Sequence, residues 1–210
     1  MLRKRLALVP LFAVALMQAA TPQASLSDQE RRQLLDLIAE SQETFLGLLA
    51  GVSDEQWDFK SDPDRWSIGE CAEHIMRSNE SLFASAKEAL DSEPDPNWFE
   101  KTKGKTEFLV RVMPNRNAGG AGGATAPQEV RPTGDVSRAE IVQRFRALYK
   151  EIGALALKSE GPVKSHTKKH SFPAFGDLNA YDWAIYVPLH TIRHSKQMIE
   201  VMETNGYPEH

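Results

Sequence analysis

Two histidines, His190 and His194, stand four residues apart in a segment whose apolar residues recur at helical spacing. Residues four apart lie one turn apart on the same face of a helix, and two imidazoles placed in this way can bind one metal ion. Two neutral imidazoles buried without partners would be unfavourable, so the alternative to a metal site is a pair of hydrogen-bonded core histidines. The residues between them are Thr191, Ile192 and Arg193, so the segment lacks the glutamate of the His-Glu-x-x-His protease motif.

A third histidine, His74, lies on a separate predicted helix, at the margin of its apolar stripe and beside Cys71. If the two helices pack together, three imidazoles form a set that leaves coordination positions open for water or substrate. The helical angle of His74 is borderline, so the spacing alone leaves open whether it faces the other two. Cys71 could be a soft ligand or a nucleophile, but we expect a small buried hydrophobic residue.

Polar residues near these histidines are candidates to orient them. Gln197 and Glu73 are expected to accept hydrogen bonds from the imidazoles. Arg193 either orients a ligand or completes the surface of its helix. The tripeptide Asn79-Glu80-Ser81 matches the glycosylation sequon, but it lies within a predicted helix, and we interpret the match as chance.

Two further histidines, His166 and His170, also stand four apart, in a basic stretch flanked by glycine and proline. We expect both to lie in a loop, with one of them a weaker candidate to line the site.

Four segments begin with the same pattern, in which a capping residue is followed three positions later by an acid. Such a pair can form a capping box at the N-terminus of a helix. Apolar residues then follow at spacings of three and four, which is helical rather than alternating. The four starts are Ser27/Glu30, Ser67/Glu70, Ser137/Glu140 and Asn179/Asp182. Four amphipathic helices predict an all-α fold, a four-helix bundle.

The predicted bundle domain spans residues 26–205 and has two irregular features. The connection at 93–135, between the second and third helices, is long enough for a crossover. It contains a Gly/Ala run at 118–124, which we expect to be a mobile surface loop. Pro188 falls inside the fourth segment and should kink that helix or delay its start.

Residues 1–20 have the order of a secretory signal peptide, with three basic residues, a short apolar run and a small-residue exit. The apolar run is shorter than the ~20 residues that span a bilayer, so we expect no stable membrane span after processing. No cysteine lies near the exit, which excludes a lipoprotein anchor. The sequence therefore predicts a periplasmic or secreted protein, the alternative being an uncleaved N-terminal tether.

Composition excludes several classes of protein. The 210 residues include 25 basic and 29 acidic side chains, for a net charge of −4, and 41% are hydrophobic. This is ordinary globular composition rather than that of a disordered or fibrous chain. It lacks the basic excess of a general nucleic-acid binder, so we expect no nucleic-acid partner. A single cysteine excludes an intramolecular disulfide.

The residues around the histidines resemble the DinB-like (DinB/YfiT-type) superfamily over roughly residues 26–202. The stretch 65–75, with its Trp-Ser and His-Ile pairs, is similar to the opening of the second helix in that family. The stretch 175–183, followed by 190–197, is similar to its Phe-Gly…Trp…His-x-x-Arg-His-x-x-Gln ending. The resemblance implies a four-helix bundle with a three-histidine divalent-metal site. Its ligands would be His74, His190 and His194.

The resemblance also implies a range of activities, since characterised relatives include metal-dependent transferases and isomerases that use low-molecular-weight thiols. This chain departs from the pattern in its enlarged 93–135 connection and in the distance of His170 from Gly176. Thiol cofactors are mainly cytoplasmic, so the predicted export disfavours a thiol transferase.

Two functions therefore stay open. The chain could be a metal-dependent enzyme acting on a small molecule, either a transferase of the thiol transferase type or a hydrolase. It could instead bind a metal or a small ligand without turnover. Three imidazoles suit Zn, Ni, Co or Fe, and we expect Zn or Ni. The sequence leaves open whether the chain forms a homodimer.

Overall fold

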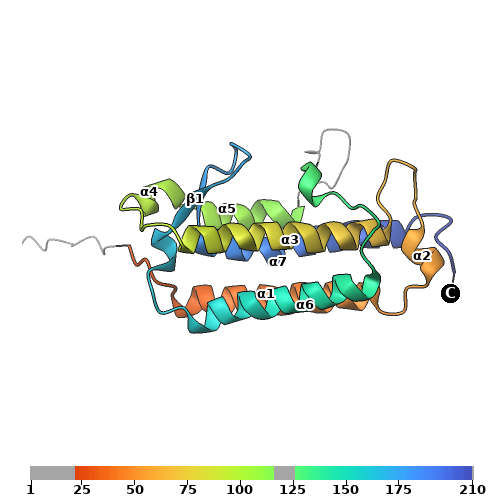
Figure 1. Ribbon diagram of the computed structural model, residues 1–210, viewed down its shortest axis with the longest axis horizontal. Helices are drawn as coiled ribbons and strands as arrows, with labels where there is room; N and C mark the ends of the chain where they lie inside the picture. The colour runs from red at the N-terminus through yellow and green to blue at the C-terminus, as the bar shows by residue number, and fades with distance from the viewer. Residues whose placement is uncertain (1–21, 116–125, 210) are drawn as a thin grey trace, which may run out of the picture.

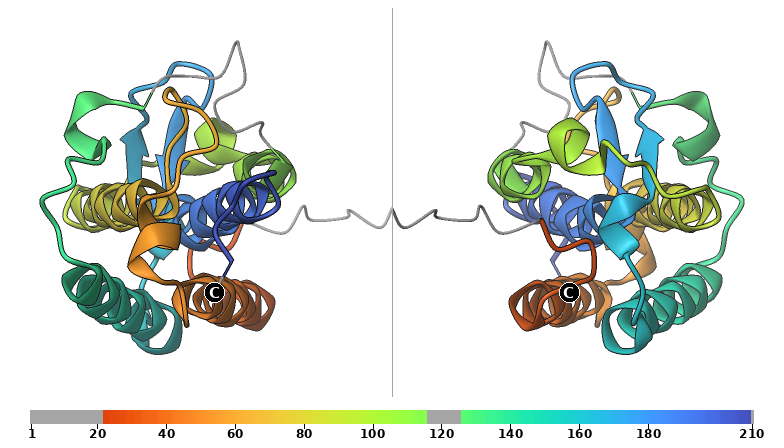
Figure 2. Two further views of the ribbon diagram at one scale, coloured as in Figure 1. Left: turned by 90° about the vertical axis from the view of Figure 1, so that its right-hand side faces the viewer. Right: turned by 90° about the vertical axis from the view of Figure 1, so that its left-hand side faces the viewer.

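The computed structural model describes residues 22–115 and 126–209 and confirms the all-α fold. Four long helices form two layers, with α3 and α7 side by side in one layer and α1 and α6 in the other (Figures 1 and 2). These helices are α1 (Asp28–Leu49), α3 (Ile68–Leu90), α6 (Arg138–Lys158) and α7 (Ala180–Met202). The expected signal peptide at 1–20 and the Gly/Ala run at 118–124 lie outside the described residues.

Each long helix begins at the capping residue expected from the sequence. Complete capping boxes, with both reciprocal hydrogen bonds, start α1, α3 and α7. At α6 the Ser137 side chain accepts from the Glu140 N–H, and no return bond is formed. A further box that the sequence analysis missed, Ser53 with Gln56, starts the short helix α2 (Asp54–Asp58). These caps satisfy backbone donors that a helix start leaves unpaired.

Helix α7 begins at its cap and continues through Pro188 as one α-helix, so the expected delay of its start is wrong. The proline ring removes one backbone hydrogen bond from the helix interior. Neighbouring elements compensate because they pack all round α7, and 18 of its 23 residues are buried. Tertiary packing here outweighs a local helix-breaking preference.

The long crossover between α3 and α6 is confirmed, but much of it is helical rather than a loop. Its described residues, 93–115 and 126–135, contain two short helices and two 3-10 turns: α4 (Trp98–Thr102), α5 (Lys105–Val112), η1 (Met113–Asn115) and η2 (Gln128–Val130). Helix α5 and η1 pack on α7 and cover the face of α7 that the other long helices leave open. The crossover is thus part of the packed body.

A two-stranded antiparallel sheet precedes α7, where the sequence analysis expected only a loop. A 3-10 turn, η3 (Val163–Ser165), leads into β1 (Thr167–Lys169), which pairs with β2 (Asp177–Asn179). Gly176 closes the turn with a φ of +64°, a left-handed conformation that glycine adopts without strain. The hairpin lies beside the C-terminal half of α3 and the N-terminal half of α7 (Figure 1).

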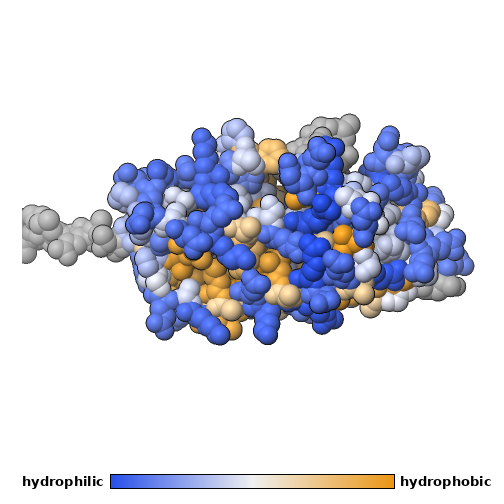
Figure 3. All heavy atoms as spheres, in the orientation of Figure 1, coloured by the Kyte–Doolittle hydropathy of each residue, from blue (hydrophilic) through white to orange (hydrophobic). Residues whose placement is uncertain are grey.

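The surface of the molecule is mostly polar. Figure 3 shows polar residues over most of one face, with apolar residues visible mainly where α3 meets α6. Within the described residues, no helix is both long enough and apolar enough to cross a membrane.

Candidate metal centre

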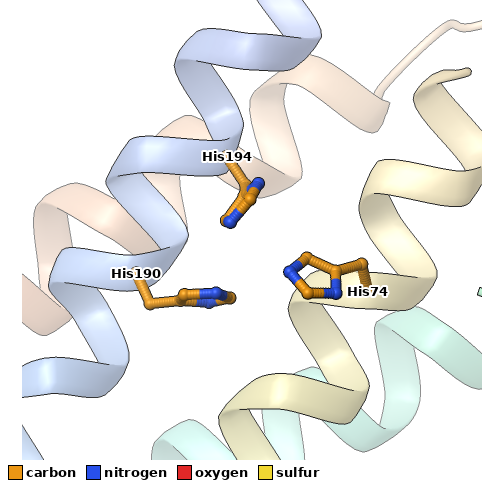
Figure 4. A group of neighbouring side chains, drawn as sticks. All are labelled: His74, His190 and His194. Carbon is orange, nitrogen blue, oxygen red and sulfur yellow. The ribbon is translucent and has the colours of Figure 1, made fainter. Parts of the chain in front are cut away.

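The structure brings together the three histidines that the sequence singled out. His74 comes from the second turn of α3, and His190 and His194 come from successive turns of α7. One ring nitrogen from each lies within 4.8 Å of the others, and the ring centroids are 4.5–5.2 Å apart. Figure 4 shows the three rings pointing toward one another across the space between the two helices. We call these three residues the histidine cluster.

Each imidazole of the histidine cluster has an oxygen acceptor at Nδ1. His74 Nδ1 lies 2.8 Å from the Val130 carbonyl oxygen. His190 Nδ1 lies 3.2 Å from Asn79 Oδ1, and His194 Nδ1 lies 2.8 Å from Gln197 Oε1. An acceptor at Nδ1 requires this nitrogen to carry the hydrogen, so the lone pair of each neutral ring is on Nε2. Ser78 Oγ approaches the His74 ring at the longer distances of 3.3 and 3.4 Å.

A buried polar network extends from His190 to the opposite layer of the bundle. Asn79 receives the His190 hydrogen on Oδ1 and donates through Nδ2 to Thr191 Oγ1 over 2.7 Å. Thr191 also accepts from the Tyr149 hydroxyl at 2.8 Å, and Tyr149 Oη lies 3.0 Å from Ser41 Oγ. The network thus joins α7, α3, α6 and α1. Because Asn79 Nδ2 donates to Thr191, Asn79 Oδ1 is the atom that faces His190.

Glu73 does not contact the histidines, so its expected role as an imidazole partner is wrong. Its carboxylate accepts from the backbone N–H groups of Thr133 and Gly134 at 3.0 and 2.8 Å, and from Arg77 at 3.0 Å. Burial alone would raise the pKa of Glu73, but these hydrogen bonds outweigh it and lower the pKa. Because the same segment supplies the Val130 carbonyl, Glu73 positions the partner of His74 indirectly.

Electrostatics keeps the histidine cluster neutral. Burial is the main cause that lowers the pKa of all three imidazoles, and the positive charge of Arg193 acts in the same direction; the pKa of His74 is about 4. The side chains are only 4–8% exposed. Neutral imidazoles are the form that binds a metal ion.

The histidine cluster opens onto a cavity of about 650 Å³. Its walls come from α3, α7, η2, the hairpin turn and the loop before α3. Trp66 from that loop lies over His74, with ring centroids 4.6 Å apart. The volume is in the range of cavities that hold small molecules.

The other residues that the sequence analysis singled out differ in how close they lie to the cavity. His170 is buried and lines the cavity, whereas His166 is half-buried and bonds the Ser92 carbonyl through Nδ1. Cys71 is fully buried, which raises the pKa of its thiol, so it fits the expected core role. Arg193 and Gln197 both line the cavity.

Sequence reasoning missed two partners of the histidine cluster. Asn79 was interpreted as part of a chance sequon, yet its side chain is fully buried beside His190. An asparagine within the buried stretch of a helix is a signal that could have identified it. The Val130 carbonyl had no sequence signal, because a backbone atom carries no residue identity.

The donor set of the histidine cluster fits a divalent metal ion. Three neutral imidazoles with unprotonated Nε2 atoms are ligands that first-row transition metals and Zn²⁺ accept. Their Nδ1 acceptors are of the kind that orient metal-binding histidines in other proteins. The three residues could therefore hold a metal ion together, and the donors alone do not identify the metal.

Comparisons with known proteins agree with this arrangement. A family model described as the DinB superfamily matches residues 37–198, a range that includes the whole histidine cluster. The uncharacterised protein YuaE of Bacillus subtilis (strain 168) is 24% identical over 156 residues, which cover 74% of this chain and 88% of that protein. No solved structure matches the chain.

Proposed function

The chain belongs to the DinB superfamily, and from this premise we propose that it is a metalloprotein whose His74, His190 and His194 bind one Zn²⁺ or Ni²⁺ ion. The observation that carries the proposal is the Nδ1 acceptor on each ring, since it leaves three Nε2 lone pairs for a shared ion. Imidazole is a good ligand for both metals.

The function that the geometry supports best is a metal-dependent reaction on a small molecule, a transfer or a hydrolysis. An ion held by three protein ligands keeps positions open for a substrate atom, which it can polarise as a Lewis acid. The cavity beside the histidine cluster offers about 650 Å³ for that substrate. Burial of the three imidazoles limits their contact with bulk water.

A second candidate is binding without turnover, because the buried acid beside His74, Glu73, is engaged elsewhere. Among the described residues, the group of potential ligands contains three histidines and no carboxylate. The nearest buried acid, Glu73, is already engaged with the crossover segment. A protein with this donor set could bind a metal or a small ligand without transforming it.

The metal site is tested by replacing one ligand. Wild-type protein prepared without chelators should hold about one Zn²⁺ or Ni²⁺ per chain after incubation and gel filtration, as measured by elemental analysis. His194→Ala should lose most of that metal while its circular dichroism remains helical, because the caps and apolar stripes do not depend on it.

His166→Ala is the matched control, since His166 lies outside the cavity lining and should retain full occupancy. Wild-type occupancy well below one ion per chain after incubation with both metals would refute the proposed function.

We further propose that the protein is exported, on the strength of the basic, apolar and small-residue order of residues 1–20. Mass spectrometry of protein recovered from outside the cytoplasm should find an N-terminus between about residues 20 and 27. Full-length chain confined to the cytoplasm would show that these residues do not direct export.

A further inference from the structure

The crossover segment 126–135 is a wall of the cavity that is attached to α3 by polar contacts. Four of its residues line the cavity beside the histidine cluster: Ala126, Pro127, Glu129 and Val130. No residue of η2 is buried, so the segment packs little apolar surface against the bundle. A segment with few buried apolar contacts depends on its hydrogen bonds to stay in place.

These hydrogen bonds come from a carboxylate of α3 and from the arginine one turn after it. Glu73 accepts from the Thr133 N–H at 3.0 Å, from the Thr133 hydroxyl at 2.9 Å and from the Gly134 N–H at 2.8 Å. Arg77 donates to the Glu73 carboxylate at 3.0 Å and to the Glu129 carbonyl at 3.4 Å. Consecutive backbone N–H groups that converge on an anion form a strong binding site for it. We call Glu73, Arg77, Thr133 and Gly134 the latch.

The backbone of Gly134 has the conformation that this contact needs. Its φ is +78°, in the left-handed region that residues other than glycine rarely adopt. A Cβ at this position would meet no other atom within 4 Å, so Gly134→Ala strains the backbone without a steric clash. This substitution therefore weakens the latch while it leaves Glu73 in place.

The latch acts on His74 through the carbonyl of Val130. That oxygen lies 2.8 Å from His74 Nδ1 and so places the ring hydrogen on Nδ1. A neutral histidine side chain in water favours the opposite tautomer, with the hydrogen on Nε2. Ser78 Oγ lies 3.3 and 3.4 Å from the two ring nitrogens and does not select between them. The Val130 carbonyl therefore inverts the usual preference and leaves the lone pair on Nε2.

We propose that Glu73 is a positioning residue for His74. Through the latch it holds the crossover segment closed, and the Val130 carbonyl of the closed segment keeps His74 in the tautomer that can bind a metal ion. The metal part of this inference rests on the proposed function, whereas the effect on the tautomer does not. By linkage, the factor by which closure of the segment strengthens metal binding is also the factor by which bound metal favours closure.

The tautomer is measured first, on metal-free protein at neutral pH, by nitrogen NMR of isotope-labelled histidine, with the His74 signals assigned from His74→Gln. Burial lowers the pKa of His74 to about 4, so the ring is neutral under these conditions. We expect wild type to carry the hydrogen on Nδ1. Glu73→Gln and Gly134→Ala should both shift His74 toward the Nε2–H form, because each weakens the latch. Glu80→Gln is the matched control, since it removes a carboxylate of the same helix that pairs with Arg144 instead.

Metal affinity and amide exchange then test the linkage. Glu73→Gln should weaken Zn²⁺ binding about 10-fold in competition with a chelator, whereas Glu80→Gln should change it by less than about 2-fold. In wild type, Zn²⁺ should slow hydrogen exchange at the Thr133 and Gly134 amides by a similar factor of about 10, and the effect should be smaller in Glu73→Gln. Circular dichroism is measured for each variant.

The outcomes separate this inference from the proposed function. An unchanged His74 tautomer in both Glu73→Gln and Gly134→Ala would overturn the proposal, because the latch would then hold the segment without positioning His74. Equal Zn²⁺ affinities in wild type and Glu73→Gln would also overturn it. If wild type binds no metal, the proposed function fails, and the tautomer measurement still decides the role of Glu73. If Glu73→Gln does not fold, Gly134→Ala decides that role alone.

Discussion

The α1–α6 pair and the α3–α7 pair begin with the same kind of N-cap but bury very different side chains. Helix α1 buries five of its 22 residues, in a single stripe, whereas α7 buries 18 of 23. The polar residues buried in α1 and α6 are Ser41 and Tyr149, and both belong to the network that ends at His190. Helices α3 and α7 bury the histidine cluster with its partners.

The two helix pairs therefore have different roles in the bundle. An amphipathic stripe on α1 or α6 stabilises the fold through apolar burial. Buried polar side chains on α3 and α7 cost stability unless they are paired, and here they surround the candidate metal centre. The two buried polar side chains of α1 and α6 therefore belong to the network that reaches the site.

The largest expected effect comes from truncating a core side chain in the α1–α6 pair, which should lower stability without changing metal binding. Phe45 is fully buried, with its ring 4.4 Å from that of Phe145. Phe45→Ala should lower the free energy of unfolding by about 3–5 kcal/mol, because it removes apolar contacts and leaves a cavity. Urea denaturation measures this loss. Metal per folded chain should stay at the wild-type value, and a parallel loss of metal would mean that the two pairs are not separable.

A smaller effect, on the order of 2–4 kcal/mol, should come from the buried cap of α7. Burial raises the pKa of Asp182 to about 7, although hydrogen bonds from Thr106 and Asn179 oppose the shift. Between about pH 4 and pH 7 the folded state keeps a proton that the unfolded state has released, so stability falls as pH rises. Asp182→Asn cannot titrate, and its stability relative to wild type should therefore increase over this range. If the free energy of unfolding changed equally with pH in wild type and in Asp182→Asn, the raised pKa of Asp182 would be contradicted.

The equivalent cap of α1 is the matched control and has the opposite sign. Burial would raise the pKa of Glu30, but hydrogen bonds from Lys164 and Ser27 lower it. Its stabilising contribution is present at neutral pH and is lost as pH falls below the normal glutamate pKa near 4.5. Glu30→Gln should therefore cost about 0.5–1 kcal/mol at pH 7 and nothing in strong acid.

The last effect concerns metal affinity alone. Asn79→Leu removes the acceptor at His190 Nδ1 and should weaken metal binding about 10–100-fold, as measured by competition with a chelator. Ser41→Ala, at the far end of the same network, should change metal affinity by less than about 2-fold. Equal losses in both variants would mean that the network acts as one unit across the two layers.

Most of the fold follows from local signals in the sequence. Each of the four caps is formed by residues within a four-residue segment, and the apolar residues recur every turn. The starts and the buried faces of the helices can therefore be predicted from short stretches of sequence. The spacing of His190 and His194 is equally local and predicts their common face. Strands β1 and β2 are three residues each, too short for an alternating pattern to stand out.

The rest of the site depends on how the helices pack. His74 faces the other two histidines because of the stagger of α3 against α7, which no spacing within α3 contains. Asn79 and the Val130 carbonyl become partners only after α3, α7 and the crossover meet. The start of α7 was misjudged for the same reason, since the packing around α7 allows Pro188 inside the helix.

The position of α7 in the chain has a consequence for biosynthesis. A ribosome produces α1, α3 and α6 before α7, so a nascent chain that has not reached residue 180 carries one of the three candidate ligands. It also exposes the apolar surface that α7 later covers, which makes it a target for chaperones. Because a complete set of candidate ligands requires α7 to dock, the proposed metal ion could be held by all three histidines only after this packing step.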